Sequence, residues 1–279
     1  MTIAEVVIRH YDWVGGRSGI KGFCEARYTL RDYFTYWRAL RRTVERDRRA
    51  AAVQASALEI PRYGQAGVLI GALADTHVLE ALPELPAEVF ELLAECGLIL
   101  HAGDITDPAV LGELERIAPV LAVQGDHDRE AGIRLPRSLV AEVEGHRIGL
   151  IHGRRRRPLE VAAALLSTAT GTLHTLGLHR HLRQSFGSVD AIVYGHLHVA
   201  DIRTVDGAMF INPGGVYTLR GDPAYLPAKL SDRAFDRATA AMPPSALKPS
   251  LALIRAERGR PLDVTLRTLS RSIRPGVSR

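Results

Sequence analysis

Apolar and polar segments alternate regularly from residue 67 onward. Apolar runs at 67–73, 97–100 and 120–123 are separated by amphipathic segments at 86–95 and 108–117. Continuous apolar runs of this length are typical of strands buried on both faces, and helices of this length supply the crossovers between them. The pattern therefore predicts parallel strands joined by right-handed helical crossovers.

The later part of the chain has shorter apolar runs and more turn signals. We expect a more antiparallel half, with helices outside two packed sheets, and strands at 138–143, 147–151, 191–194, 202–205 and 208–211. Residues 222–249 are rich in proline and polar side chains, which predicts a long loop. A closing hairpin is expected at about 250–268, from strands at 250–255 and 262–266.

Residues 1–66 differ in pattern from the rest of the chain, so we expect an N-terminal extension, partly helical or flexible, before a main domain at 67–279. Apolar side chains recur at helical spacing through 29–56, and arginines occupy the opposite face. A solvated helix face is the favoured interpretation, and a nucleic-acid patch is the alternative. The segment is also a candidate for recruiting a protein partner, and a misassigned start codon would equally produce it.

Composition narrows the class of protein. A chain of 279 residues that is 46% hydrophobic can bury one large core. It has neither an apolar run of about 18 residues nor a secretory signal, so no membrane partner is expected. Two distant cysteines argue against a disulfide framework and favour a cytoplasmic location. The net charge of +5 favours anionic partners only weakly.

Five short motifs carry the main indication of chemistry. They occur in the order Asp75-Thr76-His77, Gly103-Asp104, Gly125-Asp126-His127-Asp128, His152-Gly153 and Gly195-His196-Leu197-His198. The first three follow predicted strands, where an open α/β sheet places its functional groups. Carboxylates can bridge two cations, and imidazoles complete the coordination of manganese, iron, cobalt, nickel or zinc. The motifs therefore predict a site for two divalent cations.

The order of these motifs resembles that of the calcineurin-like metallophosphoesterase superfamily, and most closely its small bacterial and archaeal phosphodiesterases. The resemblance covers about 68–216 and the final hairpin, and it implies a four-layer α/β/β/α sandwich of two mixed sheets. It also implies roles for individual residues. The first metal would be held by Asp75, His77 and His198, the second by Asp126, His152 and His196, and Asp104 would bridge them. His127 would be the general acid or transition-state donor, and Asp128 would orient its ring.

The predicted function is a metal-dependent phosphodiesterase that uses a di-metal-bound hydroxide, with manganese the favoured metal. A phosphomonoesterase or nuclease is the second candidate, and the expected substrate is a phosphoester such as a nucleotide or nucleic acid. The rival class is a non-catalytic scaffold, because the superfamily includes a retromer subunit that uses the fold for protein contacts. The complete set of metal-competent side chains, together with His127, favours the enzyme.

One position departs from the family pattern, because Asp126 stands where the family usually has asparagine. The third carboxylate lowers the net charge of ligands and metals by one unit. We therefore expect tighter metal binding, a weaker pull on the substrate anion and a less acidic bridging water.

Residues near the motifs have structural or functional interpretations. Four arginines at 154–157 follow the His152 motif; Arg154 and Arg155 are the candidate substrate-binding residues, with solvated surface as the alternative. Asp107, before Pro108, is expected to cap a helix. His101 is expected to be a packed core residue rather than a ligand, and the turn at 212–214 is expected to be structural.

Overall fold

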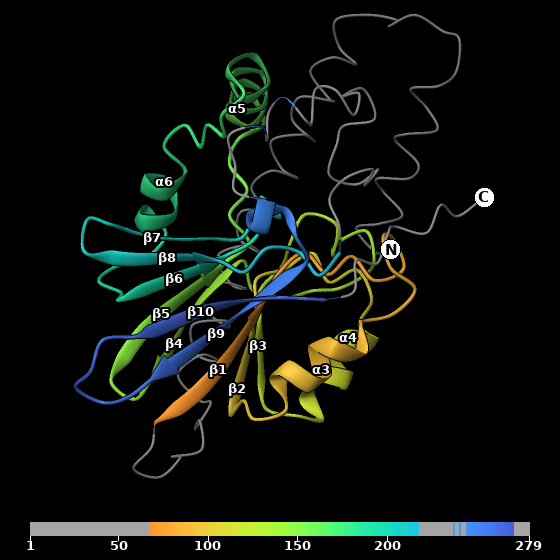
Figure 1. Ribbon diagram of the computed structural model, residues 1–279, viewed down its shortest axis with the longest axis vertical. Coiled ribbons are helices and arrows are strands. Elements are labelled where there is room, and N and C mark those ends of the chain that lie inside the picture. The colour runs from red at the N-terminus through yellow and green to blue at the C-terminus, as the bar shows by residue number, and fades with distance from the viewer. Residues whose placement is uncertain (1–66, 218–236, 238–239, 241–243, 271–279) are drawn as a thin grey trace, which may run out of the picture. The chain divides into compact units, whose positions relative to one another are not determined.

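The structure, a computed structural model, describes residues 67–217, 237, 240 and 244–270. Within these ranges the chain forms two five-stranded sheets (Figure 1). The predictions for the N-terminal extension lie outside the described residues, as does most of the loop predicted at 222–249. The end of that loop segment contains a short 3-10 helix, η1 (Pro244–Leu247).

The first sheet has the strand order β10-β9-β1-β2-β3. Three strands, β1 (Val68–Leu73), β2 (Leu98–His101) and β3 (Val120–Ala122), are parallel and are connected by α3 (Ala87–Leu93) and α4 (Ala109–Glu115). The other two, β9 (Ser250–Ala256) and β10 (Asp263–Thr268), form an antiparallel hairpin that pairs with β1. The strand-helix alternation predicted from the sequence is confirmed.

The second sheet has the order β4-β5-β6-β8-β7. Antiparallel pairs form its edges, and its strands are β4 (Ser138–Val143), β5 (His146–Ile151), β6 (Ala191–Tyr194), β7 (Asp201–Val205) and β8 (Ala208–Asn212). Its centre is parallel, because β6 pairs in parallel with both β5 and β8. Four of the six described pairings that involve strands after residue 137 are antiparallel, so the later half is the more antiparallel one, as predicted. Two helices that the sequence left unassigned, α5 (Arg157–Thr170) and α6 (Leu178–Gln184), supply the crossover from β5 to β6.

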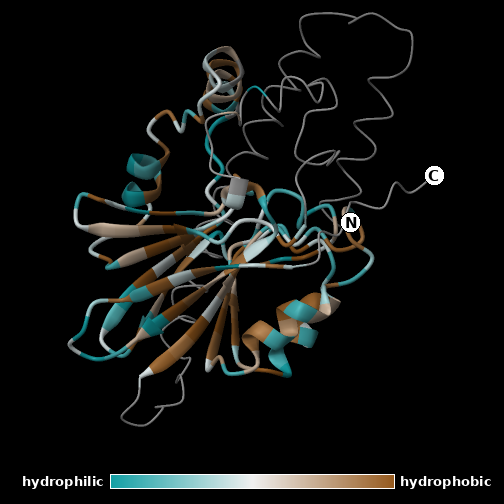
Figure 2. Cartoon of the chain, viewed as in Figure 1, coloured by the Kyte–Doolittle hydropathy of each residue, from teal (hydrophilic) through white to brown (hydrophobic). Residues whose placement is uncertain are grey.

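Three buried clusters build four layers. The largest lies between the sheets, where side chains such as Ile70 and Leu100 face Leu150 and Val193. A second packs α3 and α4 on the outer face of the first sheet, and a third packs α6 on the second sheet. Hydrophobic colour runs along most of β1, β2 and β3, as burial on both faces requires (Figure 2). The predicted α/β/β/α sandwich of two mixed sheets is confirmed.

None of the helices in the described part of the chain is long and apolar enough to cross a membrane.

Candidate metal centre

The predicted ligands follow the carboxyl ends of parallel strands. Asp75 follows β1, Asp104 follows β2 and Asp126 follows β3, while His152 and His196 follow β5 and β6. Because parallel strands end at the same edge of their sheet and the two sheets face each other, five loops converge. Fold topology therefore brings together side chains that are more than 100 positions apart.

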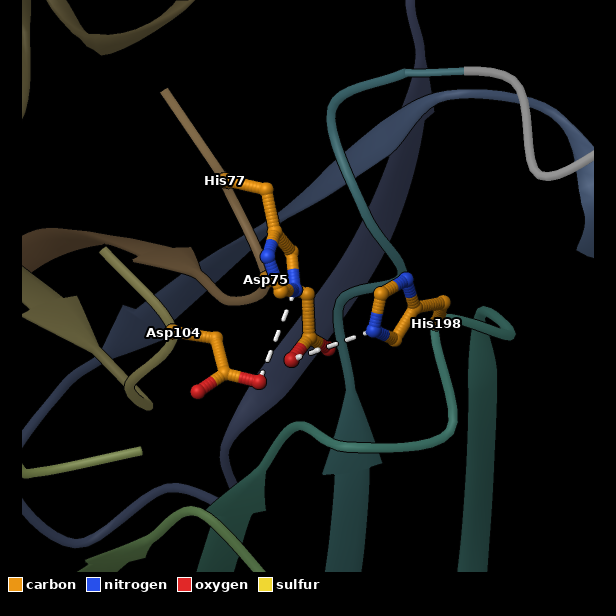
Figure 3. A group of neighbouring side chains, drawn as sticks. All are labelled: Asp75, His77, Asp104 and His198. Carbon is orange, nitrogen blue, oxygen red and sulfur yellow. Dashed lines mark ion pairs between the residues drawn. The ribbon is translucent and has the colours of Figure 1, made fainter. Parts of the chain in front are cut away.

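Among the described residues, three groups of side chains lie close enough to hold a cation: His77, Glu80 and His127 form one, and the other two consist of predicted ligands. In one of these two, ligand atoms of Asp75, His77, Asp104 and His198 lie within 4.8 Å of one another (Figure 3). The other consists of Asp126, His152 and His196, within the same distance. This grouping matches the ligand sets that the family resemblance implied.

Asp104 stands between the two groups of predicted ligands. Its Oδ2 lies 3.5 Å from Nε2 of His77 and 3.3 Å from Nε2 of His152, so one oxygen faces a histidine of each group. Buried atoms around it have no hydrogen bond of normal geometry among the described residues, namely Oδ2 of Asp75 and Nε2 of His77 and His152. Unpartnered buried polar atoms are costly, and a divalent cation would supply their missing partner. The carboxylate and imidazole donors therefore fit divalent metals.

The charges of the site favour cations. Burial lowers the pKa of His152, but the carboxylates of Asp104, Asp126 and Asp75 together outweigh burial and hold the pKa well above its ordinary value. Conversely, burial raises the pKa of Asp104, while His152 and His77 hold it below its usual range. Burial raises the pKa of Asp75 to about 6. A divalent cation placed among these carboxylates would be attracted in the same way, since they favour positive charge at this position.

Five of the seven predicted ligands have a left-handed backbone. Their φ angles are 51° for Asp75, 44° for His77, 56° for Asp104, 70° for His196 and 53° for His198. Residues other than glycine rarely adopt this backbone region, and each residue held there carries about 1–3 kcal/mol of strain. Strain concentrated on these positions is typical of functional sites, where the surrounding structure over-determines the backbone.

Hydrogen bonds set the orientation of the predicted ligands. The Nδ1 of His152 lies 2.9 Å from the Ala102 carbonyl oxygen, so this nitrogen donates and Nε2 faces the site. The Nδ1 of His198 lies 3.0 Å from the Tyr217 hydroxyl. The backbone N–H of His196 donates to Oδ1 of Asp75, and the other oxygen of Asp75 has no hydrogen bond within the described part of the chain, so it is available to a cation. Partners of this kind fix ring orientation and tautomer in metal sites.

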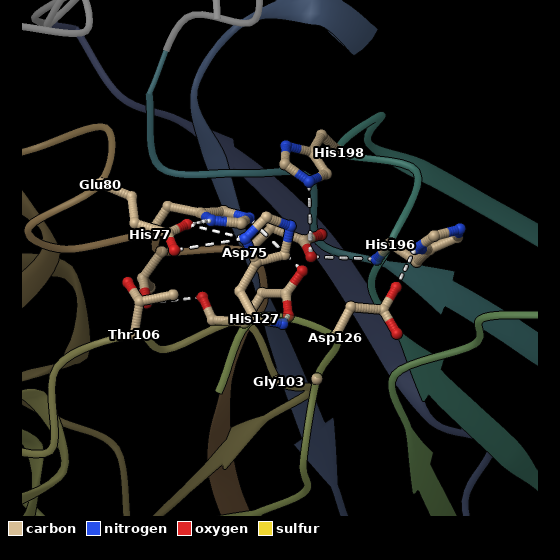
Figure 4. A network of polar contacts seen from close by, with 12 residues as sticks. Asp75, His77, Glu80, Gly103, Thr106, Asp126, His127, His196 and His198 are labelled. Carbon is tan, nitrogen blue, oxygen red and sulfur yellow. Dashed lines mark hydrogen bonds and ion pairs between the residues drawn. The ribbon is translucent and has the colours of Figure 1, made fainter. Parts of the chain in front are cut away.

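The carboxylate of Asp128, which was predicted to orient the ring of His127, is hydrogen-bonded to the backbone. It is fully buried and accepts four backbone N–H groups, from Ile105 at 2.6 Å, Gly125 at 2.7 Å, Thr106 at 3.0 Å and Asp104 at 3.1 Å. Asp128 therefore holds the loop that carries Asp104, because a buried carboxylate is best satisfied by several N–H donors. The ring of His127 instead contacts a different carboxylate, that of Glu80 (Figure 4).

Gly125 is required by the close approach of two loops. A Cβ at this position would lie 2.1 Å from the backbone nitrogen of Asp104 and 2.2 Å from its Oδ1. The backbone N–H of His127 also donates to that Oδ1, at 2.9 Å. The motif at 125–128 and the Asp104 loop therefore pack as one unit, which only a glycine at 125 permits.

The two candidate substrate-binding arginines have different surroundings. Arg154 is half exposed, and its guanidinium donates to Oδ1 of Asp126 at 3.0 Å. Arg155 is buried and pairs with Glu160 through two hydrogen bonds, at 2.8 and 2.9 Å, and it also donates to the carbonyl of Thr175. Arg155 is therefore engaged by its own chain, whereas Arg154 is accessible from solvent, and a substrate contact stays a prediction for both.

Residues predicted to be structural are structural. His101 is fully buried, and both ring nitrogens are engaged, by the Thr76 hydroxyl and the Gly103 N–H, each at 3.2 Å. The Asp107 carboxylate accepts the N–H of Ala109 at the start of α4, as a helix cap does. Asn212 donates to the Gly195 carbonyl at 3.1 Å and so supports the loop of His196 and His198.

Sequence reasoning missed three side chains around the centre. Glu80 contacts the rings of His77 and His127, Glu160 lies 3.6 Å from Nε2 of His196, and Tyr217 contacts His198. Only Glu80 had a usable signal, since it follows His77 by three positions within one turn. The others come from elements whose positions only the folded chain reveals.

A four-layer sandwich with carboxylate and imidazole groups gathered at one edge defines a metal-binding α/β protein. Residues 68–232 match the calcineurin-like phosphoesterase superfamily domain, and the chain belongs to this superfamily. Membership supports metal-dependent phosphoester hydrolysis as the general activity.

Two archaeal relatives agree with this assignment. A probable metallophosphoesterase of Methanothermobacter thermautotrophicus is 38% identical over 170 residues, covering 61% of this chain and 90% of the relative. One from Methanocaldococcus jannaschii is 33% identical over 147 residues, covering 53% and 67%. Among solved structures, Vacuolar Protein Sorting 29 from Cryptosporidium parvum aligns with a TM-score of 0.49 and 20% identity, over 74% of this chain and 99% of that one. Similarity at that level does not indicate a shared function.

Proposed function

We propose that the chain is a metal-dependent phosphodiesterase whose site holds two divalent cations. The observation that carries this proposal is the position of Asp104, with one oxygen facing a histidine of each ligand group. A carboxylate placed in this way suits a bridge between two cations. Two such ions would neutralise the phosphoryl oxygens and lower the pKa of water.

The protein residues then have separate tasks. Asp75, His77 and His198 would surround one cation and Asp126, His152 and His196 the other. His127 lies beside the group that contains His77, and the centroids of the two imidazole rings are 4.9 Å apart. Its side chain is 35% exposed, so it is accessible to a leaving oxygen, to which it would give a proton.

Charge favours a diester over a monoester. Three carboxylates, Asp75, Asp104 and Asp126, would offset three of the four positive charges on two divalent cations. The remaining charge matches the single negative charge of a phosphodiester better than the two of a monoester. The carboxylate oxygens suit manganese, which is the metal proposed, and the imidazoles also accept iron, nickel or zinc. Nucleotides or nucleic acids in the cytoplasm are the proposed substrates.

The test uses the full chain, stripped of metal with a chelator and then supplied with manganese. Substrates are bis-p-nitrophenyl phosphate, p-nitrophenyl phosphate and single-stranded DNA. We expect manganese-dependent hydrolysis that prefers the diester, and a loss of at least ~100-fold in kcat for Asp104→Asn, because the bridging charge is removed. Asp107→Asn is the matched control, since an exposed cap tolerates asparagine.

Other outcomes identify the alternatives. Preference for the monoester would indicate a phosphomonoesterase, and cleavage of DNA alone would indicate a nuclease. If no substrate shows chelator-sensitive turnover, the enzyme proposal is wrong and a protein-interaction scaffold is favoured.

A further inference from the structure

Glu80 contacts two histidines with one carboxylate. Its Oε2 lies 2.9 Å from Nδ1 of His77 and 3.0 Å from Nδ1 of His127, and its Oε1 lies 3.3 Å from the latter nitrogen (Figure 4). The side chain is 37% exposed, so the carboxylate sits at the rim of the site rather than within it. It belongs to neither of the two predicted ligand groups.

Backbone geometry brings Glu80 back over the ring of His77. The N–H groups of Glu80 and Ala81 donate to the His77 carbonyl, at 3.1 and 2.7 Å. Leu79, within this turn, has a φ of 71°, a strained value that the turn requires. The chain is therefore folded locally so that the carboxylate reaches the ring three positions earlier.

Both rings point the same atom toward Glu80. Because Nδ1 of His77 faces the carboxylate, its Nε2 faces Asp104 and is one of the buried atoms that have no hydrogen bond to the residues the structure describes. The ring of His127 packs edge-on against that of His77, with an angle of 82° between them, and presents its Nδ1 to the same carboxylate. A carboxylate bound to one ring nitrogen fixes the tautomer and directs the other nitrogen toward the metal or the substrate.

We propose that Glu80 is a positioning residue, which orients the metal-facing ring of His77 and the proton-donating ring of His127 together. Asp128 does not do this, since its oxygens are occupied by four backbone N–H groups. This inference rests on the proposed function, but its metal-binding part stands on geometry alone. One carboxylate would thus couple the position of the first cation to that of the proton donor.

The experiment uses Glu80→Gln in the full chain, with Glu84→Gln as the control, because Glu84 is an exposed carboxylate in the same loop. Glutamine keeps the shape but has one accepting oxygen, so its NH₂ group would oppose one ring N–H. Calorimetric titration of the chelator-stripped protein with manganese measures the metal affinity, which depends on the orientation of the His77 ring. We expect the dissociation constant to rise by about 10–100-fold in Glu80→Gln and to stay unchanged in the control.

Kinetics at saturating manganese measure proton donation by His127 to the leaving oxygen. Bis-p-nitrophenyl phosphate releases a phenolate that needs no proton, whereas a dithymidine phosphodiester releases an alkoxide that does. We expect kcat of Glu80→Gln to fall by about 100-fold on the dithymidine substrate and by less than about threefold on the aryl one. An equal loss on both substrates would indicate a merely structural role and overturn the inference, as would an unchanged manganese affinity.

Two further measurements distinguish an effect on ring position from a loss of folding and from a failure of the proposed function. If the thermal midpoint of Glu80→Gln drops strongly, the Glu80→Asp variant is measured instead. Its side chain is shorter by one methylene, so we again expect weaker manganese binding and a loss of kcat that is larger on the dithymidine substrate. If the wild type hydrolyses neither diester, the proposed function fails, and the manganese titration alone decides whether Glu80 orients His77.

Discussion

Asp128→Asn tests whether one buried charge holds the loop of Asp104. The side chain is fully buried, with Oδ1 accepting the N–H groups of Ile105 and Thr106, and Oδ2 those of Asp104 and Gly125. Asparagine has the same shape but one accepting oxygen. Whichever way its amide turns, the NH₂ group opposes two of these four N–H groups.

The expected cost follows from the two donors left without a partner. Each buried, unsatisfied N–H costs about 1–3 kcal/mol, so the free energy of unfolding should fall by about 2–6 kcal/mol. That is a large part of the roughly 5–15 kcal/mol that stabilises a typical domain. Asp104 and Thr106 have φ angles of 56° and 65°, so the loop would relax from this strained form once its hydrogen bonds weaken. Manganese affinity should fall with it.

Urea unfolding of chelator-treated protein provides the measurement. Asp107→Asn is the control, because that carboxylate caps α4 at the surface and asparagine caps equally well. Its stability should change by less than about 0.5 kcal/mol. A loss below about 1 kcal/mol in Asp128→Asn would refute the reasoning. Unchanged stability with a lowered kcat would restore the role of orienting His127.

Four further predictions concern single residues. Arg155→Gln should lower the free energy of unfolding by about 3 kcal/mol, because it removes a buried guanidinium and leaves the partly buried Glu160 without its ion pair, while Arg154→Gln should leave the stability unchanged. Similar urea midpoints for the two variants would contradict this. Gly125→Ala should destabilise the fold by about 3 kcal/mol and weaken manganese binding, since a Cβ has no room; wild-type values in both assays would show that the loops can separate. Asp126→Asn should bind manganese about tenfold more weakly and shift the acid limb of the pH-rate profile to lower pH; an unchanged affinity and profile would reject the charge effect. In chelator-treated protein, NMR should show the ring of His127 titrating with a pKa of about 9, so that it is charged below that pH; a value near 6.5 would mean that its carboxylate partner is not bound in solution.

Strand positions were predictable because strands buried on both faces consist of consecutive apolar residues. The runs ending at Leu73 and Tyr194 are apolar throughout, and strands β4 and β6 have the predicted bounds. α5 was missed, although Pro158 in its first turn and the left-handed Gly171 at its end are ordinary helix signals. Its exposed apolar side chains, such as Leu165, gave no clean amphipathic pattern. Without that helix, the parallel pairing of β5 with β6 could not be foreseen.

By itself, the sequence determined which residue types stand at the ends of strands, and hence the two sets of candidate metal ligands. The order of metal-binding side chains along the chain can be recognised without knowing any tertiary contact. Only the tertiary structure decided which carboxylate serves which partner. Asp128 is adjacent to His127 in the chain, yet it turns to four backbone N–H groups, and Glu80, 47 positions earlier, meets that ring. Burial requires every donor of the Asp104 loop to be satisfied, and that requirement depends on packing rather than on neighbours in sequence.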